Sequence, residues 1–486
     1  MAINRKIKTP SKPFIKNKQQ AAQALHEVDS KAAWQSVFQL TPERKLLCVI
    51  TIALTGFLGA LGWHYYLVAF HNVPYPLNTF LFNPGDRFND YYNYVKDAMD
   101  AYKTPASNRT TMPLPMFLFQ VVAENFNSDY VLILESVVFM MGSIWFVAHF
   151  LPYADKFLNR VLAMSLVCFS YPFLFCIDRS NLECPVFLAL AAFVWFYVEG
   201  KTAWAVMCLG LAMALKPYVL FLLPVFIADR KLWAGVQVVG VTFALSLVSL
   251  LLLGGDIFSS LNVLGASGTQ YNDSYVIGNE GLYFGSSLFG FCKLMAASYT
   301  QDGILGVDCR SLPWSLHFPP ASHWFTFAST HDWQAFLQRM THYYFFFSIV
   351  VFVLVTACLW VWRVDLWKRV AVLICCMNLL PYVCGDYRIM HFFLPLALFL
   401  QEKNRSRLDL LYVGIFGLLL IPKSYFHFAY APVFQIRNLE VSEAVYMNPL
   451  LMVLLMTLIL TSAIVGRSWS QDALTLAARL GWRPRS

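Results

Sequence analysis

Long apolar runs are the feature of this sequence that most limits its fold. Runs of about 20 apolar residues, the length at which a helix crosses a bilayer, recur from Leu46 almost to the end of the chain. The chain is 58% hydrophobic and 13% charged, whereas soluble domains carry about 25% charged residues. We therefore expect an all-α polytopic membrane protein.

Basic residues give the orientation. Residues 1–45 form a Lys-rich arm that has no apolar core and is too long for a cleaved signal peptide. The positive-inside rule places this arm and the basic tail, residues 467–486, in the cytoplasm. Between them, residues 46–466 are expected to form a transmembrane domain with large outer loops at 71–128 and 254–340, which carry short helices.

Apolarity alone defines about 12 crossings, and the basic residues then fall on the inner turns. The runs 204–215 and 218–228 are short for a bilayer and are separated at Pro217, so we expect broken helices that line a cavity. The predicted spans are 46–70, 130–151, 161–176, 185–198, 204–215, 218–228, 233–253, 341–362, 370–383, 392–400, 408–421 and 448–465.

Several functional classes have no support in the sequence. It has no glycine-rich dinucleotide or nucleotide-phosphate motif and no zinc-type CxxC pair, and its net charge of +8 reflects topology rather than nucleic-acid binding. His317, His323 and His331 lack a compact ligand spacing, so no metal is expected. Cys292 and Cys309 share a predicted outer loop, and their spacing leaves pairing open.

The first outer loop contains a charged stretch, GDRFNDYYNYVKD, which includes Asp86, Arg87 and Asp90. Ionisable groups beside membrane helices are costly and are usually kept for a task. Asp90 is therefore a candidate general base, although such charges can also simply solvate a helix end. We predict a short helix because apolar residues recur at helical spacing, at Tyr91, Tyr94, Val95 and Ala98.

Other polar residues gather on the same predicted side. Short outer turns have little need for Arg and Lys unless they hold an anion, and phosphate suits both side chains. Each group also has an ordinary interpretation: Asp178 or Ser180 as a helix N-cap, Lys216 reaching the interface, and Arg388 and His391 pairing with Asp386. The outer groups are Asp178, Arg179, Asn181, Glu183, Lys216, Asp386, Tyr387, Arg388 and His391.

Four segments occur in a characteristic order: FNDYYNYVKDA, RSNLECPVFLALAAF, GLAMALKPYVLFLLPVF and GDYRIMHFFLPLALFL. This order resembles the polyprenyl-phosphate-dependent glycosyltransferases of the GT-C superfamily, and most of all the family 87 mannosyltransferase type. The resemblance covers most of residues 46–401, and its most specific part is the segment 210–224.

The resemblance implies an inverting transfer of a hexose or pentose, with a mannose-like sugar favoured, from a polyprenyl-phosphate donor to a hydroxyl of a glycan or glycolipid. No cofactor, metal or nucleic acid is implied, and the partners are the donor, the acceptor and membrane lipids. It implies a GT-C-like bundle in a multi-pass membrane protein of bacterial inner-membrane type, with its site on the periplasmic side. The implied residues are Asp90 as base with Asp86 in reserve; Lys216, Arg388, Arg179 and His391 for the donor phosphate; and Arg87, Tyr91, Asn181, Asp386 and Tyr387 for substrate.

Two other classes fit part of the pattern. A transporter or flippase for a lipid-linked saccharide also needs cations and broken helices, but it predicts polar groups on both faces and internal repeats. A polymerase or ligase would take its glycan from a diphosphate-linked donor. The polar groups of this chain gather on one predicted side, which favours the transferase.

Overall fold

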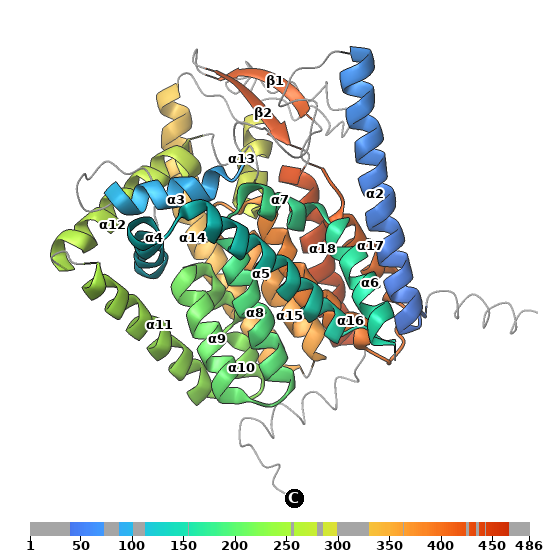
Figure 1. Ribbon diagram of the computed structural model, residues 1–486. Helices are drawn as coiled ribbons and strands as arrows, with labels where there is room; N and C mark the ends of the chain where they lie inside the picture. Colours follow the sequence, from blue (N-terminus) through green and yellow to red (C-terminus); the bar gives the residue numbers. More distant parts are fainter. Residues whose placement is uncertain are drawn as a thin grey trace, which may run out of the picture.

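The chain folds as a bundle of helices with one small sheet (Figure 1). The computed structural model describes residues 39–71, 87–100, 112–153, 155–253, 257–278, 285–298, 330–362, 364–423, 427–433, 437–442 and 444–465.

Five helices of the described chain are long and apolar enough to cross a membrane. An α-helix rises about 1.5 Å per residue, so about 20 residues are needed for a 30 Å hydrocarbon core. The protein is therefore a helical membrane protein, whereas the 12 predicted crossings are not confirmed. The five helices are α2 (Pro42–His71), α5 (Ser128–His149), α11 (Leu232–Leu252), α14 (Thr330–Val361) and α18 (Ala444–Val465).

The predicted span 161–176 is divided into two helices. Helix α6 (Lys156–Cys168) and helix α7 (Tyr171–Arg179) meet at an angle of 69°. Pro172 lies in the first turn of α7, where its missing N–H and its restriction of the preceding residue break the helical ladder. The pair is a sixth candidate crossing if both parts belong to one span.

Shorter apolar helices form the interior of the bundle. Helix α15 is buried around most of its circumference, which is typical of a helix enclosed by other helices. Helix α8 packs between α5 and α9, and α15 packs against α16 and α18. The short elements are α8 (Glu183–Val198), α9 (Thr202–Leu215), η1 (Pro217–Leu222), α10 (Pro224–Ala228), α15 (Leu366–Leu379), η5 (Asp386–Phe392), α16 (Phe393–Gln401) and α17 (Asp409–Leu420).

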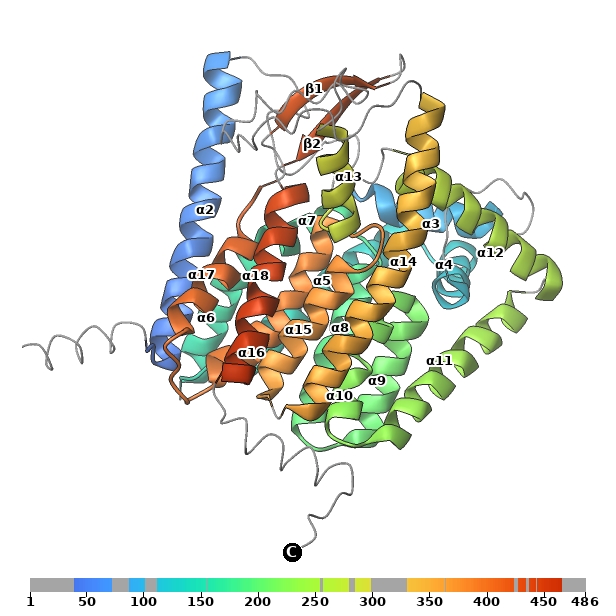
Figure 2. The same ribbon diagram turned by 180° about the vertical axis from the view of Figure 1, so that it is seen from behind.

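The two predicted outer loops contribute elements to one end of the bundle. Figures 1 and 2 show α3, α12, α13 and the hairpin at this end and α10 at the other. The antiparallel hairpin of β1 and β2 was not predicted from the sequence. The elements from the two loops are α3 (Asn89–Asp100), α4 (Pro113–Asn125), α12 (Ile257–Tyr271), the π-helix η2 (Asn272–Ile277) and α13 (Leu288–Ser298). The hairpin comes from a later segment and consists of β1 (His427–Val433) and β2 (Arg437–Ser442).

Lys293 ties two of these outer elements together. Its ammonium group, on α13, donates to the carbonyls of Val276 and Ile277 at 3.1 and 3.2 Å and also to that of Gly278, at the end of η2. Burial lowers the pKa of Lys293 to about 7. The contact fixes α13 beside the helix that precedes it.

A buried ion pair fastens α2 to the bundle. The ammonium of Lys45 lies 3.6 Å from a carboxylate oxygen of Asp409, donates to the carbonyl of Glu402 at 3.3 Å and lies 4.3 Å from the centre of the Phe399 ring. Both charged side chains are almost fully buried. Removal of one partner would leave the other charge without compensation.

We expect Lys45→Met to lower the free energy of unfolding by about 3–5 kcal/mol, the usual cost of leaving one buried charge unpaired. The double variant Lys45→Met/Asp409→Asn should recover much of this loss, because asparagine can still accept from the Ser406 amide, which now lies 3.0 Å from Asp409. Denaturant unfolding in detergent measures both effects. Wild-type stability of the single variant would show that the pair contributes little.

Candidate functional site

Helix α3 carries the candidate base and is held firmly against the bundle. The amide of Phe88, just before α3, donates to the carbonyl of Asp178 at 2.8 Å. Phe88 has a φ of 58°, a strained conformation for a bulky residue. The hydroxyl of Tyr91 donates to the carbonyl of Ser128 at 2.8 Å, and Tyr94 stacks on Phe119 of α4.

The predicted helical spacing in this stretch is confirmed. Tyr91, Val95 and Ala98 are buried on one face of α3. That face packs on α4 and on α7. Asp90 consequently points away from the packed face, toward the turn between α7 and α8.

Both carboxylate oxygens of Asp90 are hydrogen-bonded to that turn. Arg179 donates to one oxygen at 2.9 Å, and the amide of Asn181 donates to the other at 2.6 Å. The Asp90 side chain remains 19% exposed. A carboxylate can accept about four hydrogen bonds, so Asp90 can still receive a substrate hydroxyl.

The turn between α7 and α8 does not have the helix N-cap that the sequence left open as an ordinary interpretation. Ser180 is the left-handed C-cap of α7, with φ 44°, and Leu182 precedes the first residue of α8. The side chain of Asn181 accepts from the amide of Glu183 at 3.1 Å. The N-cap interpretation of Asp178 or Ser180 is therefore wrong, because Asp178 lies in the last turn of α7 and Ser180 is the residue at which α7 ends.

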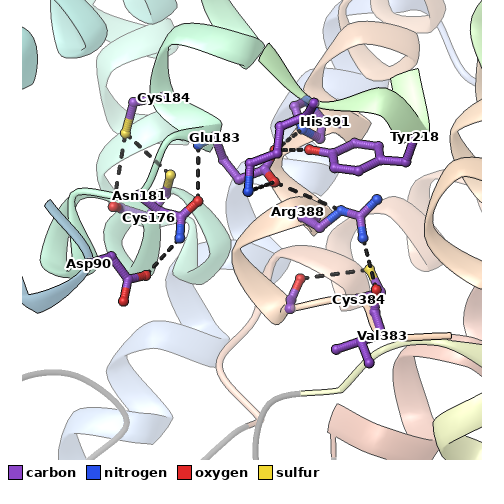
Figure 3. Close-up of polar contacts among 12 residues, drawn as sticks. Asp90, Cys176, Asn181, Glu183, Cys184, Tyr218, Val383, Cys384, Arg388 and His391 are labelled. Carbon is purple, nitrogen blue, oxygen red and sulfur yellow. Dashed lines mark hydrogen bonds and ion pairs between the residues drawn. The ribbon is translucent and has the colours of Figure 1, made fainter. Parts of the chain in front are cut away.

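Asn181 connects the carboxylate of Asp90 to the backbone of Glu183. Its amide nitrogen binds Asp90, and its oxygen accepts from the backbone of Glu183. Figure 3 shows Asn181 between Asp90 on one side and the Glu183 group on the other. Both ends of the Asn181 side chain are thus bonded within the protein, which favours a positioning role over the predicted substrate contact.

Glu183 is the centre of the second group and is almost fully buried. One of its oxygens accepts from the hydroxyl of Tyr218 and lies 2.9 Å from Nε2 of His391. The other oxygen lies 3.9 Å from both Lys216 Nζ and Arg388 Nε. The carboxylate of Glu183 therefore lies near both cations but accepts a hydrogen bond from neither, so Lys216 and Arg388 Nε can still donate to another group.

Arg388 is fixed by the backbone and by an aromatic ring. Two of its nitrogens donate to the carbonyls of Val383 and Met377, each at 3.1 Å. Its guanidinium lies 3.4 Å from the centre of the Tyr218 ring, a cation–π contact. Its third nitrogen, Nε, has no hydrogen-bond partner within the described residues.

Lys216 lies at the break between α9 and η1. Its side chain is 22% exposed, and in the part of the chain that is described no hydrogen bond reaches its ammonium group. Burial by itself lowers the pKa of Lys216, but the surrounding acidic groups, including Tyr94 and Glu183, outweigh burial and raise it. Lys216 is therefore a charged donor with open hydrogen bonds.

Tyr387 is near enough to both Asp90 and Glu183 for their charges to act on its phenol. Burial, and then nearby acidic groups that include Asp90 and Glu183, raise the pKa of its phenol well above its ordinary value. Tyr387 therefore stays protonated. The electrostatic neighbours of Tyr387 and Lys216 also include Tyr94 and Tyr271, so α3 and α12 border the same region.

The remaining predicted residues have varied positions. Asp386 accepts a hydrogen bond from the hydroxyl of Ser286 and another, at 3.3 Å, from the amide of Asn448 on α18. These contacts tie η5 to α18 and to the segment just before α13. Arg87 is exposed at the turn before α3. Asp86 lies outside the described residues.

Sequence reasoning did not assign a role to Glu183 or Tyr218, which the structure places at the centre of the site. An acidic residue two positions after the Asn181 turn, and a tyrosine directly after Lys216-Pro217, were the available signals. No residue group in the described chain has the composition and geometry of a metal site; Cys309, His317 and His323 lie outside it. Comparison with known proteins finds no matching family model, curated protein or solved structure.

Proposed function

We propose that this protein is a membrane glycosyltransferase that moves a sugar from a polyprenyl-phosphate donor to a glycan or glycolipid hydroxyl on the outer face of the membrane. We further propose a GT-C-like bundle in which the short interior helices complete about 12 crossings. The motif order supports this proposal, and so do the contacts that bring Asp90 to Arg179 and that bring Glu183 to Lys216 and Arg388. A mannose-like sugar is favoured by the resemblance.

The proposal rests on the hydrogen bonds that Lys216 and Arg388 can still donate. Arg388 Nε has no hydrogen-bond partner among the described residues, although the side chain is only 6% exposed, and the nearest carboxylate oxygen to both Arg388 Nε and Lys216 Nζ is that of Glu183, at 3.9 Å. Leaving a buried charged donor unsatisfied is costly. A phosphate oxygen between Lys216 and Arg388 would satisfy both groups with charge-assisted hydrogen bonds.

The charge of the group suits a phosphate with a single negative charge. Lys216 and Arg388 are opposed by one carboxylate, that of Glu183, while Arg179 and Asp90 neutralise each other. Counting Lys216 and Arg388 against Glu183 leaves one positive charge. A sugar phosphodiester carries one negative charge, whereas a diphosphate carries more, so the balance favours the monophosphate donor over the diphosphate of a polymerase or ligase.

The proposed reaction is a single inverting displacement. The acceptor hydroxyl donates to Asp90, which takes its proton as the new bond forms between the acceptor oxygen and the anomeric carbon. The bond from the anomeric carbon to the phosphate oxygen breaks on the opposite side. Lys216 and Arg388 stabilise the negative charge on the departing polyprenyl phosphate.

A donor assay with purified protein tests the proposal. Polyprenyl-phosphate mannose and the corresponding diphosphate-linked sugar are offered with a glycolipid acceptor, and products are identified by mass spectrometry. We expect transfer from the monophosphate donor only, with release of polyprenyl phosphate. Transfer from the diphosphate donor alone would indicate a polymerase or ligase, and movement of intact donor across vesicles without transfer would indicate a transporter.

A further inference from the structure

Two cysteines face each other at the turn that carries the site. The sulfur atoms of Cys176, in the last turns of α7, and Cys184, in the first turn of α8, lie 3.3 Å apart. The sulfur of Cys184 also lies 3.9 Å from the carbonyl of Cys176. Both side chains are buried, and Figure 3 shows them beside Asn181.

The residues between the two cysteines are those that organise the site. They include Arg179 and Asn181, which bind Asp90, and Glu183, which faces the cations. The carbonyl of Asp178, in the same segment, receives the amide that precedes α3. Any bond across the base of this turn would therefore fix the position of both groups.

We propose that Cys176 and Cys184 form a disulfide bond that closes the turn between α7 and α8. The proposal does not depend on the identity of the substrate, but it does require that this turn lies on the oxidising, outer side of the membrane.

The bond would form by thiol–disulfide exchange. The thiolate of one cysteine attacks a disulfide of an oxidising protein or small molecule and gives a mixed disulfide and one released thiol. The second cysteine then attacks the mixed disulfide, forms the Cys176–Cys184 bond and releases the second thiol of the oxidant. Two thiols of the chain are oxidised, and one disulfide of the oxidant is reduced to two thiols.

The geometry requires little movement. A disulfide has a sulfur–sulfur distance of about 2.05 Å, so the sulfurs must approach by roughly 1.2 Å from their present contact. Both cysteines lie next to the turn, where Ser180 already has a left-handed conformation. Adjacent Cys375 and Cys376 on α15 are also buried, but neighbouring residues of a helix point in different directions, which makes them a suitable control.

The bond would add a covalent constraint to a turn that is otherwise held by hydrogen bonds, such as those from the amide of Asn181 to the carbonyl of Cys176 and from the amide of Cys184 to the carbonyl of Asn181. A cross-link between these cysteines restricts the freedom of the segment in partly unfolded states. Arg179, Asn181 and Glu183 would then remain aligned with α3 and η5 when the helices around them move. Reduction should consequently loosen the site before it disturbs the rest of the bundle.

Peptide mass spectrometry tests the bond directly. Membranes from a host that oxidises proteins on the outer side are denatured with N-ethylmaleimide and no reductant, and the chain is digested. We expect one linked peptide pair containing Cys176 and Cys184, separated by reduction, while Cys375 and Cys376 are recovered as maleimide adducts. Recovery of Cys176 and Cys184 as adducts too would overturn the proposal.

Thermal unfolding supplies a second measurement. Reductant should lower the unfolding midpoint of the detergent-solubilised wild type by several degrees and leave the Cys176→Ser/Cys184→Ser variant unchanged. Cys375→Ser should respond to reductant like wild type. An equal reductant effect in wild type and the double variant would overturn the proposal, and the peptide measurement decides the case if the double variant does not fold.

Discussion

Replacing Asp90 with asparagine is expected to lower sugar transfer about 10²- to 10⁴-fold, the usual contribution of a positioned general base. Asparagine has nearly the shape of aspartate but cannot accept the hydroxyl proton. Its nitrogen would also face either Arg179 or Asn181, both of which donate to Asp90 in the wild type. Initial rates with a polyprenyl-phosphate sugar measure the effect.

Asp129→Asn is the matched control. Asp129 lies in the first turn of α5 and accepts from the hydroxyl of Tyr92 on α3 at 2.7 Å. Asp129→Asn therefore replaces a carboxylate by an amide, as Asp90→Asn does, at a side chain that also contacts α3. Unlike Asp90, Asp129 makes no hydrogen bond or ion pair with the turn between α7 and α8 that carries Glu183. We expect activity within about twofold of wild type, since exposed polar contacts contribute little.

Two results would argue against Asp90 as base. Near-normal activity of Asp90→Asn would remove the assignment. Equal losses in Asp90→Asn and Asp129→Asn, with a lower unfolding midpoint in both, would show that Asp90 only fastens α3 to the turn. The ion pair with Arg179 makes this second role a real alternative.

The sequence predicted the helical segments well because apolar runs and their periodicity depend on local composition. The predicted spans 130–151 and 233–253 agree with α5 and α11 within two residues. The buried face of α3 was also predicted. The number of membrane crossings was harder to predict. Helices α8, α9 and α15 have 14 to 16 residues, which is too few to span a 30 Å core unless a neighbouring segment continues the crossing.

Two departures of the fold have different causes. The bend between α6 and α7 could have been predicted from Pro172, but a search for apolar runs does not take a proline into account. In the hairpin, only the short strand β2, RNLEVS, alternates between polar and apolar residues, whereas β1, HFAYAPV, does not, and the two strands are joined by pairing along the backbone. Backbone pairing leaves little trace in side-chain composition.

The sequence named several residues of the candidate site, but it gave neither their arrangement nor a role for Glu183 and Tyr218. Residue types and an expected outer side brought Asp90, Arg179 and Arg388 forward as candidates. The partners of Glu183 lie 35 and 208 residues away, at Tyr218 and His391. Only tertiary packing places these residues together, so Arg388 was paired with nearby Asp386 in one interpretation, whereas the structure places it beside Glu183.

Lys216→Met is expected to reduce kcat/KM for the donor about 10²-fold, comparable to the loss of one donor that stabilises a developing anion. Among the described residues, Lys216 has a carboxylate at 3.9 Å and no hydrogen bond, so its removal breaks few contacts of the folded protein. It also removes the one excess positive charge of the group. Binding of polyprenyl phosphate, the proposed product, should weaken in parallel.

Lys231→Met is the matched control for this change. Lys231 follows the segment of η1 and α10 just as Lys216 precedes it, and its ammonium lies 5.1 Å from the centre of the Tyr197 ring at the other end of the bundle. A loss of positive charge there should leave donor kinetics unchanged. Titration of both variants with polyprenyl phosphate separates the cases: weaker binding in Lys216→Met alone locates the anion beside Glu183, whereas unaltered binding in Lys216→Met means that the phosphate is held elsewhere.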